Sequence, residues 1–285
     1  ALAAAALLPC MVDNSFAGRP DHHVLDSLSA LAIIALLAVA ARHYKSGLRS
    51  WLPPALGVGA VAGLALVSFP SALVTVTIAL AAALLVSLWR TFRGHDARQF
   101  AAPLAIAGLL GGLGQWAFMA LFTPCFGSTT LISNTVLPGL LAMLIGGAAA
   151  ALVLLHVLVA DGGKRTTFTV GLLVLATVGA LAAILLFAGL RTALSNWLYV
   201  MAGNVIPELS PEWRPLWRTP AHWFTGKFTW AFVLIPPGLY LLVKRALSED
   251  SHPEGLLVAA ASLLLIPLAI VQAKYFVHLY APFAC

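Results

Sequence analysis

The chain has 285 residues, of which 61% are hydrophobic and only 9% are charged, and its mean hydropathy is +0.96. Because a soluble domain carries about 25% charged residues, this composition excludes an ordinary soluble protein. Apolar runs of ~18 or more residues, without the alternation of barrel strands, predict an all-α, polytopic transmembrane bundle. The net charge of +6 does not indicate nucleic-acid binding, because in a membrane protein it mostly reflects cytoplasmic Lys and Arg.

The apolar runs predict about nine to ten helices in one transmembrane domain that takes up residues 1–285. The predicted segments are the end of a helix at 1–12, then 24–41, 54–69, 72–89, 101–121, 137–160, 167–190, 228–243 and 255–272, with a last apolar stretch from about 275. The chain starts Ala-Leu-Ala, without an initiator Met or a basic leader region, and ends soon after that stretch begins. We therefore expect a fragment of a longer protein.

The charges of the connecting segments predict which side of the membrane each segment faces. Ten basic residues fall on one side: Arg42, Lys45, Arg49, Arg90, Arg93, Arg98, Lys164, Arg165, Lys244 and Arg245. Six fall on the other: Arg19, Arg191, Arg214, Arg218, Lys227 and Lys274. By the positive-inside rule, the first side is cytoplasmic. The cytoplasmic connections then hold Asp96, Asp161, Glu249, Asp250 and Glu254, and the outer side holds Asp13, Asp21, Asp26, Glu208 and Glu212.

The outer-side sequence Asp21-His22-His23 precedes the predicted helix 24–41 and offers a carboxylate and an imidazole two residues apart. That donor pair suits Mn²⁺ or another borderline divalent ion, and Mg²⁺ if the other ligands are oxygens. Asp21 is also a candidate N-cap of the helix, with Asp26 in the first turn, where a carboxylate favours the helix dipole. These residues alone are consistent with either a metal site or a helix cap.

The longest connection, 191–227, lies on the outer side and is dense in aromatic residues: Trp197, Tyr199, Trp213, Trp217, Trp223 and Phe224. Long loops in compact proteins are functional or disordered, and so many aromatic residues argue against disorder. Glu208, between two prolines, is a candidate metal ligand or acceptor-binding carboxylate, whereas the aromatic residues alone would form an interfacial belt. Arg214 and Arg218 are candidates for binding lipid phosphates or for simple interfacial anchoring.

A few further residues have both a functional and a structural interpretation. Lys274, on the outer side, would either snorkel to the interface or neutralise a phosphate leaving group as a point charge. We expect His156, near a helix end, to be a satisfied or snorkelling histidine rather than a ligand. The run 111–114 (Gly-Gly-Leu-Gly) lies inside a predicted helix, so we expect it to allow close helix approach rather than nucleotide binding. We expect Gln115 and Trp116 to serve packing.

Together, the outer-side motifs resemble those of the membrane domain of the catalytic subunit of oligosaccharyltransferases, within the GT-C class of polyprenyl-phosphate-dependent glycosyltransferases. Archaeal members of that family commonly have Asp-His-His as their second acidic motif, as at Asp21 to His23 here. Glu208, in Asn-Val-Ile-Pro-Glu-Leu-Ser-Pro, matches the Glu of the family's (Ser/Thr)-x-x-Glu loop motif, although the hydroxyl residue is absent. Lys274 stands near the position of the family's usual Arg.

The resemblance implies a metal-dependent glycosyltransferase of the plasma or inner membrane, with its active site on the non-cytoplasmic face. It would transfer a glycan from a polyprenyl-(pyro)phosphate carrier to an acceptor on the outer face, with a protein Asn as the first candidate. Asp21, His23 and Glu208 would hold Mn²⁺ or Mg²⁺ together with an Asp upstream of this chain, and Lys274 would assist electrostatically. The candidate substrate-binding residues are Arg19, His22, Trp213, Arg214 and Arg218. The family's Trp-Trp-Asp soluble domain would follow residue 285.

Three other interpretations are open from the sequence. They are a GT-C enzyme that moves a single sugar to a lipid or protein hydroxyl, a non-enzymatic transporter or flippase, and a purely structural membrane subunit, in which Asp21, His23 and Glu208 would lie far apart. Transporters place ionisable residues or broken helices near the bilayer midplane. The predicted helix interiors here are nearly free of charge, which argues against transport.

Overall fold

The computed structural model describes residues 22–68, 72–121, 137–188, 235–248 and 253–271, with the short pieces 191–192 and 195. The elements in these ranges are α-helices with one 3-10 turn: α3 (His22–His43), η1 (Tyr44–Ser46), α4 (Leu48–Ser68), α5 (Ala72–Phe92), α6 (Arg98–Leu121), α8 (Leu137–Leu158), α9 (Gly162–Leu186), α12 (Ile235–Ser248) and α13 (Pro253–Val271). The predicted all-α class is therefore confirmed.

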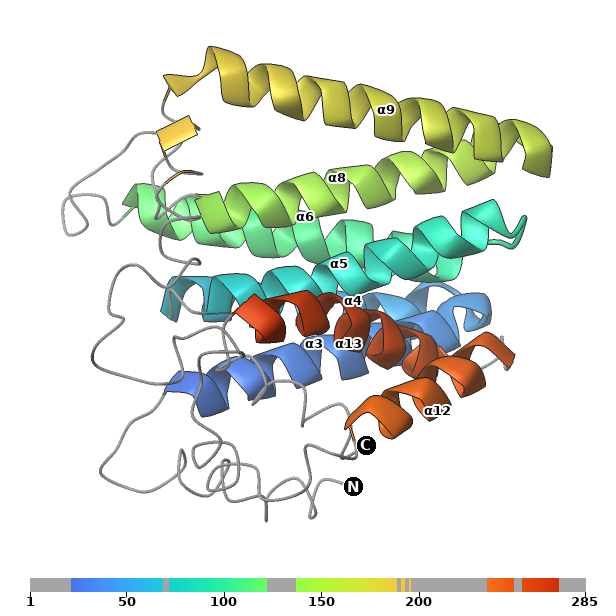
Figure 1. The fold of residues 1–285 in the computed structure, drawn as a ribbon, viewed down its shortest axis with the longest axis horizontal. Helices are drawn as coiled ribbons and strands as arrows, with labels where there is room; N and C mark the ends of the chain where they lie inside the picture. Colours follow the sequence, from blue (N-terminus) through green and yellow to red (C-terminus); the bar gives the residue numbers. More distant parts are fainter. Residues whose placement is uncertain are drawn as a thin grey trace.

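The helices lie roughly side by side along the long axis of the molecule (Figure 1). Within the described part of the chain, six of them are long and apolar enough to cross a membrane, namely α3 to α6, α8 and α9. The shorter α13 is also apolar. With a mean hydropathy of +0.96, the chain is an integral membrane protein.

Five helices begin earlier than predicted, and one of them is α6, which begins at Arg98 rather than at 101. α4 begins at Leu48 rather than 54, so that Pro53 and Pro54 lie inside it although each removes a backbone hydrogen bond. The added turn is held by packing, because the buried Trp51 contacts Tyr44, with 5.4 Å between the ring centroids. Contacts between separate helices therefore outweigh the local preference of proline for a helix start.

The other early starts change the position of three acidic residues. α3 begins at His22, so Asp26 is its fifth residue and the first turn contains no acidic residue, contrary to the prediction. α13 begins at Pro253, so Glu254 lies in its first turn rather than in a loop. α9 begins at Gly162 because the side chain of Asp161 accepts hydrogen bonds from the first-turn backbone. The predicted start of the helix 228–243 lies outside the described residues, and α12 continues to Ser248.

Helix α6 packs closely between α4 and α8 because glycines let these two neighbours approach it. On the α8 side, a Cβ on Gly108 would lie 2.6 Å from the carbonyl oxygen of Ala142, and one on Gly112 would collide with the carbonyl oxygen of Gly139. On the α4 side, a Cβ on Gly111 would lie 3.1 Å from a carbonyl oxygen of α4. Such small-residue contacts let membrane helices approach closely.

The expected roles of the residues in 111–116 are confirmed in part. Gly111 and Gly112 are at helix contacts, whereas a Cβ on Gly114 would meet nothing within 4 Å. Gln115 is fully buried and lies beside Gly139 of α8, as a packing role requires. Trp116 is 38% exposed, so its side chain is only partly covered by the described helices.

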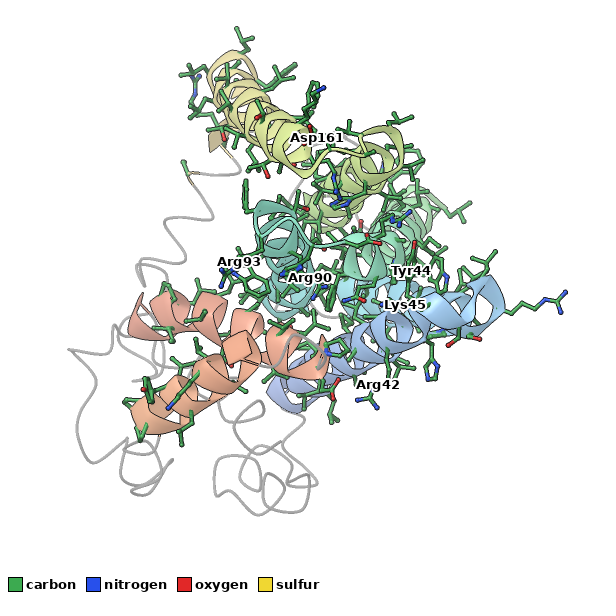
Figure 2. All side chains as sticks on the ribbon, turned by 90° about the vertical axis from the view of Figure 1, so that its right-hand side faces the viewer. Arg42, Tyr44, Lys45, Arg90, Arg93 and Asp161 are labelled. Carbon is green, nitrogen blue, oxygen red and sulfur yellow. The ribbon has the colours of Figure 1, made fainter. Side chains whose placement is uncertain are left out.

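The two ends of the bundle differ in charge. We call the end where α5 and α8 finish and α4, α6 and α9 begin the basic end, because all ten predicted cytoplasmic Lys and Arg lie in helix ends or turns there. Figure 2 views the molecule from this end and labels four of them, Arg42, Lys45, Arg90 and Arg93. At the opposite end α3 begins and α9 and α13 finish. The predicted outer-side motifs adjoin these three helix ends in the sequence.

Candidate functional site

The predicted outer-side site lies at or beyond the edge of the described structure. Asp21, Glu208 and Lys274 are outside the described residues, and so are the candidate substrate contacts Arg19, Trp213, Arg214 and Arg218. His22 and His23 are the first two residues of α3, but their side chains are not among those described. The convergence of Asp21, His23 and Glu208 on one cation therefore stays a prediction. The side chains that are described include no group of three or more His, Cys, Asp and Glu able to hold a metal ion.

A buried polar cluster lies at the basic end, around His156 in the last turn of α8. Its imidazole is 1% exposed. Nδ1 lies 2.7 Å from a guanidinium nitrogen of Arg165 in α9, and Nε2 lies 3.0 Å from the hydroxyl oxygen of Thr91 in α5. One side chain thus joins three helices.

The direction of each hydrogen bond in this cluster follows from the chemistry of Arg165. A guanidinium can only donate, so Nδ1 of His156 accepts and the ring proton is on Nε2. That N–H then donates to Thr91, whose hydroxyl donates to the backbone carbonyl of Ser87 at 2.9 Å. Both ring nitrogens have partners in the neutral tautomer, which confirms the expectation of a satisfied histidine.

The turn between α5 and α6 adds an acidic residue to the same end. Asp96 accepts hydrogen bonds from the backbone N–H of Arg98 at 2.9 Å and from its guanidinium at 2.8–3.1 Å, so it caps α6 and forms a fork-like ion pair. Burial alone would raise the pKa of Asp96, but the hydrogen bonds from Arg98 outweigh it and hold that pKa below its usual value. Its Oδ1 is 3.9 Å from Nδ1 of His156, beyond hydrogen-bonding distance.

This cluster has the features of a structural junction rather than of a catalytic site. Its imidazole is fully hydrogen-bonded, and its carboxylate is neutralised by the adjacent arginine. A general base needs a free lone pair within reach of a substrate proton. The cluster instead fixes α5, α8 and α9 to one another through His156, and Asp96 holds the α5–α6 turn to Arg98 at the start of α6.

Replacing His156 by leucine is expected to lower the free energy of unfolding by about 1–2 kcal/mol, because Arg165 and Thr91 both lose a buried partner. Unfolding in mixed dodecylsulfate micelles would measure the loss. The matched control is Thr177→Val, since the exposed Thr177 bonds only to a carbonyl of its own helix in the described structure. We expect that control to stay within about 0.5 kcal/mol of the parent. Equal losses in the two variants would contradict the junction.

Comparison with known proteins gives a structural match but no match in sequence. No family model and no curated protein matches the chain. Among solved structures, the chain is similar to the archaeal oligosaccharyltransferase AglB from Archaeoglobus fulgidus, solved in complex with an inhibitory peptide and a dolichol-phosphate. The TM-score is 0.72 and the identity 14%, over 98% of this chain and 34% of that one. The likeness shows a common fold, and the chain spans about a third of the length of that enzyme.

Proposed function

We propose that this chain is the membrane domain of a GT-C glycosyltransferase that transfers a glycan from a polyprenyl-(pyro)phosphate carrier to a protein asparagine. The observation that carries the proposal is the likeness to AglB over 98% of this chain. That enzyme was solved with a peptide and a dolichol-phosphate, molecules of the acceptor and carrier classes proposed here.

The arrangement of the helix ends supports a site on the non-cytoplasmic face. The basic end would be cytoplasmic by the positive-inside rule. α3 begins, and α9 and α13 finish, at the other end. Asp21 directly precedes α3, Glu208 belongs to the connection that follows α9, and Lys274 follows α13 by three residues. The three motifs that resemble those of oligosaccharyltransferases thus all adjoin the end assigned to the outer face.

The side chains of these motifs fit a divalent cation by their chemistry, since two carboxylates and an imidazole are a donor set that suits Mn²⁺ or Mg²⁺. Asp21, His23 and Glu208 would hold the cation, which when bound supplies Lewis-acid stabilisation of the phosphate leaving group. Lys274 would offset charge on the same phosphate. The remaining candidates, Arg19, His22, Trp213, Arg214 and Arg218, would position carrier and acceptor.

A single-sugar transferase of the same fold class is the second candidate, because the common fold does not specify the acceptor. A transporter is disfavoured by the described helix interiors. The buried polar residues there are Thr75, Ser87, Thr91, Gln115, His156, Thr169 and Ser262, and none of them is Asp, Glu, Lys or Arg. Intramembrane ionic residues are the usual sign of a transport pathway.

A transfer assay with the full-length protein in liposomes tests the proposal. The donors would be a polyprenyl-pyrophosphate oligosaccharide and a polyprenyl-monophosphate sugar, and the acceptor a fluorescent peptide with an Asn-x-Thr sequence. We expect glycopeptide from the oligosaccharide donor, loss of product with EDTA, and recovery with Mn²⁺ or Mg²⁺. If sugar is transferred only from the monophosphate donor, and only to a hydroxyl acceptor, the result would favour the single-sugar transferase. Metal-independent transfer would contradict the cation site.

A further inference from the structure

A lateral groove between α5, α12 and α13 has no part in the proposed reaction. Its volume is about 210 Å³, and its walls include Leu85 and Trp89 of α5, Val243 of α12, and Leu256 and Leu263 of α13. All its lining side chains are apolar apart from the indole nitrogen of the tryptophan. Small-molecule sites usually measure ~300–1,000 Å³ and hold a few convergent polar groups. The groove is therefore suited to a segment of hydrocarbon chain rather than to a polar ligand.

The groove is open to the lipid-facing surface and lies near the basic end. Leu85 and Leu263 on its rim are 41% and 46% exposed. Trp89 is three residues from the end of α5, and Leu256 is three residues from the start of α13. The groove thus lies at the depth where acyl chains meet the headgroups of the leaflet at this end.

A cationic side chain stands directly beside the groove. The guanidinium of Arg93 lies over the ring of Trp89, 5.6 Å from its centroid. Because Trp89 is part of the wall of the groove, this cation is in contact with the wall. Figure 2 shows Arg93 on the side of α5 that faces α12 and α13. On the opposite wall, Lys244 follows Val243 and lies over the ring of Tyr240 at 6.0 Å.

The described acidic side chains at this end are already engaged by other groups. Glu254 pairs with Arg42 at 2.6 Å, and Asp96 pairs with Arg98 at 2.8 Å. Asp161 caps α9. Neither Arg93 nor Lys244 has a carboxylate partner among the side chains that the structure describes. Among the described side chains, the charges beside the groove are therefore cationic, with Arg93 placed to meet an anion.

We propose that this groove binds an anionic phospholipid of the cytoplasmic leaflet, with one acyl chain in the groove and the phosphate against Arg93. A chain-shaped apolar recess with an adjacent cation matches a lipid that has both parts. A zwitterionic lipid of equal chain length offers the same chain but a headgroup with no net charge, so it should bind more weakly. The site is at the opposite end of the bundle from the proposed reaction, and it does not depend on that reaction.

Native mass spectrometry of the purified full-length protein tests this site with dioleoyl phosphatidylglycerol and dioleoyl phosphatidylcholine as probes. We expect the wild type to retain one phosphatidylglycerol in preference to phosphatidylcholine. The variant Arg93→Gln should lower retention of phosphatidylglycerol about fivefold, the effect of one basic residue near a membrane surface, and lower retention of phosphatidylcholine less. The matched control is Arg49→Gln at the same end, on a helix that does not line the groove. It should retain phosphatidylglycerol as the wild type does.

A second variant tests the acyl chain separately from the headgroup. Ala259 lines the groove, so Ala259→Leu should fill it and lower retention of both lipids. The proposal is overturned if the wild type retains the two lipids equally, or if Arg93→Gln retains as much phosphatidylglycerol as the wild type. It is also overturned if Arg49→Gln lowers retention of phosphatidylglycerol as much as Arg93→Gln does. Undiminished retention in Ala259→Leu would overturn the placement of the acyl chain. Displacement of phosphatidylglycerol by equimolar polyprenyl phosphate would overturn the choice of ligand and assign the groove to the carrier.

Discussion

Replacing Asp21 by asparagine is expected to lower the rate of glycan transfer about 100-fold or more while leaving the stability of the protein unchanged. Asparagine caps a helix about as well as aspartate, but it lacks the charge of a strong ligand for a hard cation. Loss of one group that stabilises charge at a transition state typically costs ~10²–10³ in rate. The variant therefore separates the two interpretations of Asp21 that the sequence leaves open.

The assay is glycopeptide formation across a range of Mn²⁺ concentrations, with thermal unfolding measured in parallel. Asp26→Asn is the matched control, because Asp26 is the fifth residue of α3 and has no predicted ligand role. We expect Glu208→Gln to behave like Asp21→Asn. Full activity in Asp21→Asn would reduce Asp21 to a helix cap and remove the proposed cation site.

Adding one methyl group at Gly112 and at Gly114 is expected to change stability in opposite directions. A Cβ at Gly112 would collide with the backbone of Gly139 and the side chain of Met143, and atoms of α8 backbone cannot yield as a flexible side chain can. Gly112→Ala should therefore lower the free energy of unfolding by about 1–3 kcal/mol. A Cβ at Gly114 meets nothing within 4 Å, so Gly114→Ala should raise it by up to about 1 kcal/mol through helix propensity.

The two alanine variants lie two residues apart on one helix, so propensity and lipid environment are closely matched between them. Unfolding in mixed micelles would give both values, and circular dichroism would confirm that the helix content is retained. If Gly114→Ala lowers the free energy of unfolding as much as Gly112→Ala does, the close contact between α6 and α8 is not the cause of the loss at Gly112.

The fold was predictable because the membrane imposes it on the sequence. Backbone groups in hydrocarbon must be satisfied internally, so long apolar runs leave little choice but helices. The predicted and observed bounds agree closely for 137–160, where α8 ends at Leu158. They differ most at α4, because the contact of Trp51 with Tyr44 joins two elements and cannot be read from one segment.

Because contacts between separate elements cannot be read from one segment, part of the polar cluster around His156 could not be predicted from the sequence. His156 was expected to be satisfied, but its partner Thr91 is 65 residues away and only the packing of α5 on α8 brings them together. Arg165 is only nine residues from His156 across a short turn, so the sequence spacing does indicate that these two residues lie close together. The spacing of Trp89 and Arg93, one helical turn apart, likewise indicated a shared surface but not the groove beside it.

The attachment of α9 has a mechanical consequence. In the described structure its spanning segment is only 6% buried, and α9 approaches α8 at the basic end and diverges from it toward the other (Figure 1). The contact with His156 fixes it at the near end. A helix of 25 residues is about 37 Å long, so a tilt of ~10° at that pivot moves the far end by roughly 6 Å. A small rotation of α9 about that contact would therefore displace its far end without disturbing the glycine contacts of α6 with α4 and α8.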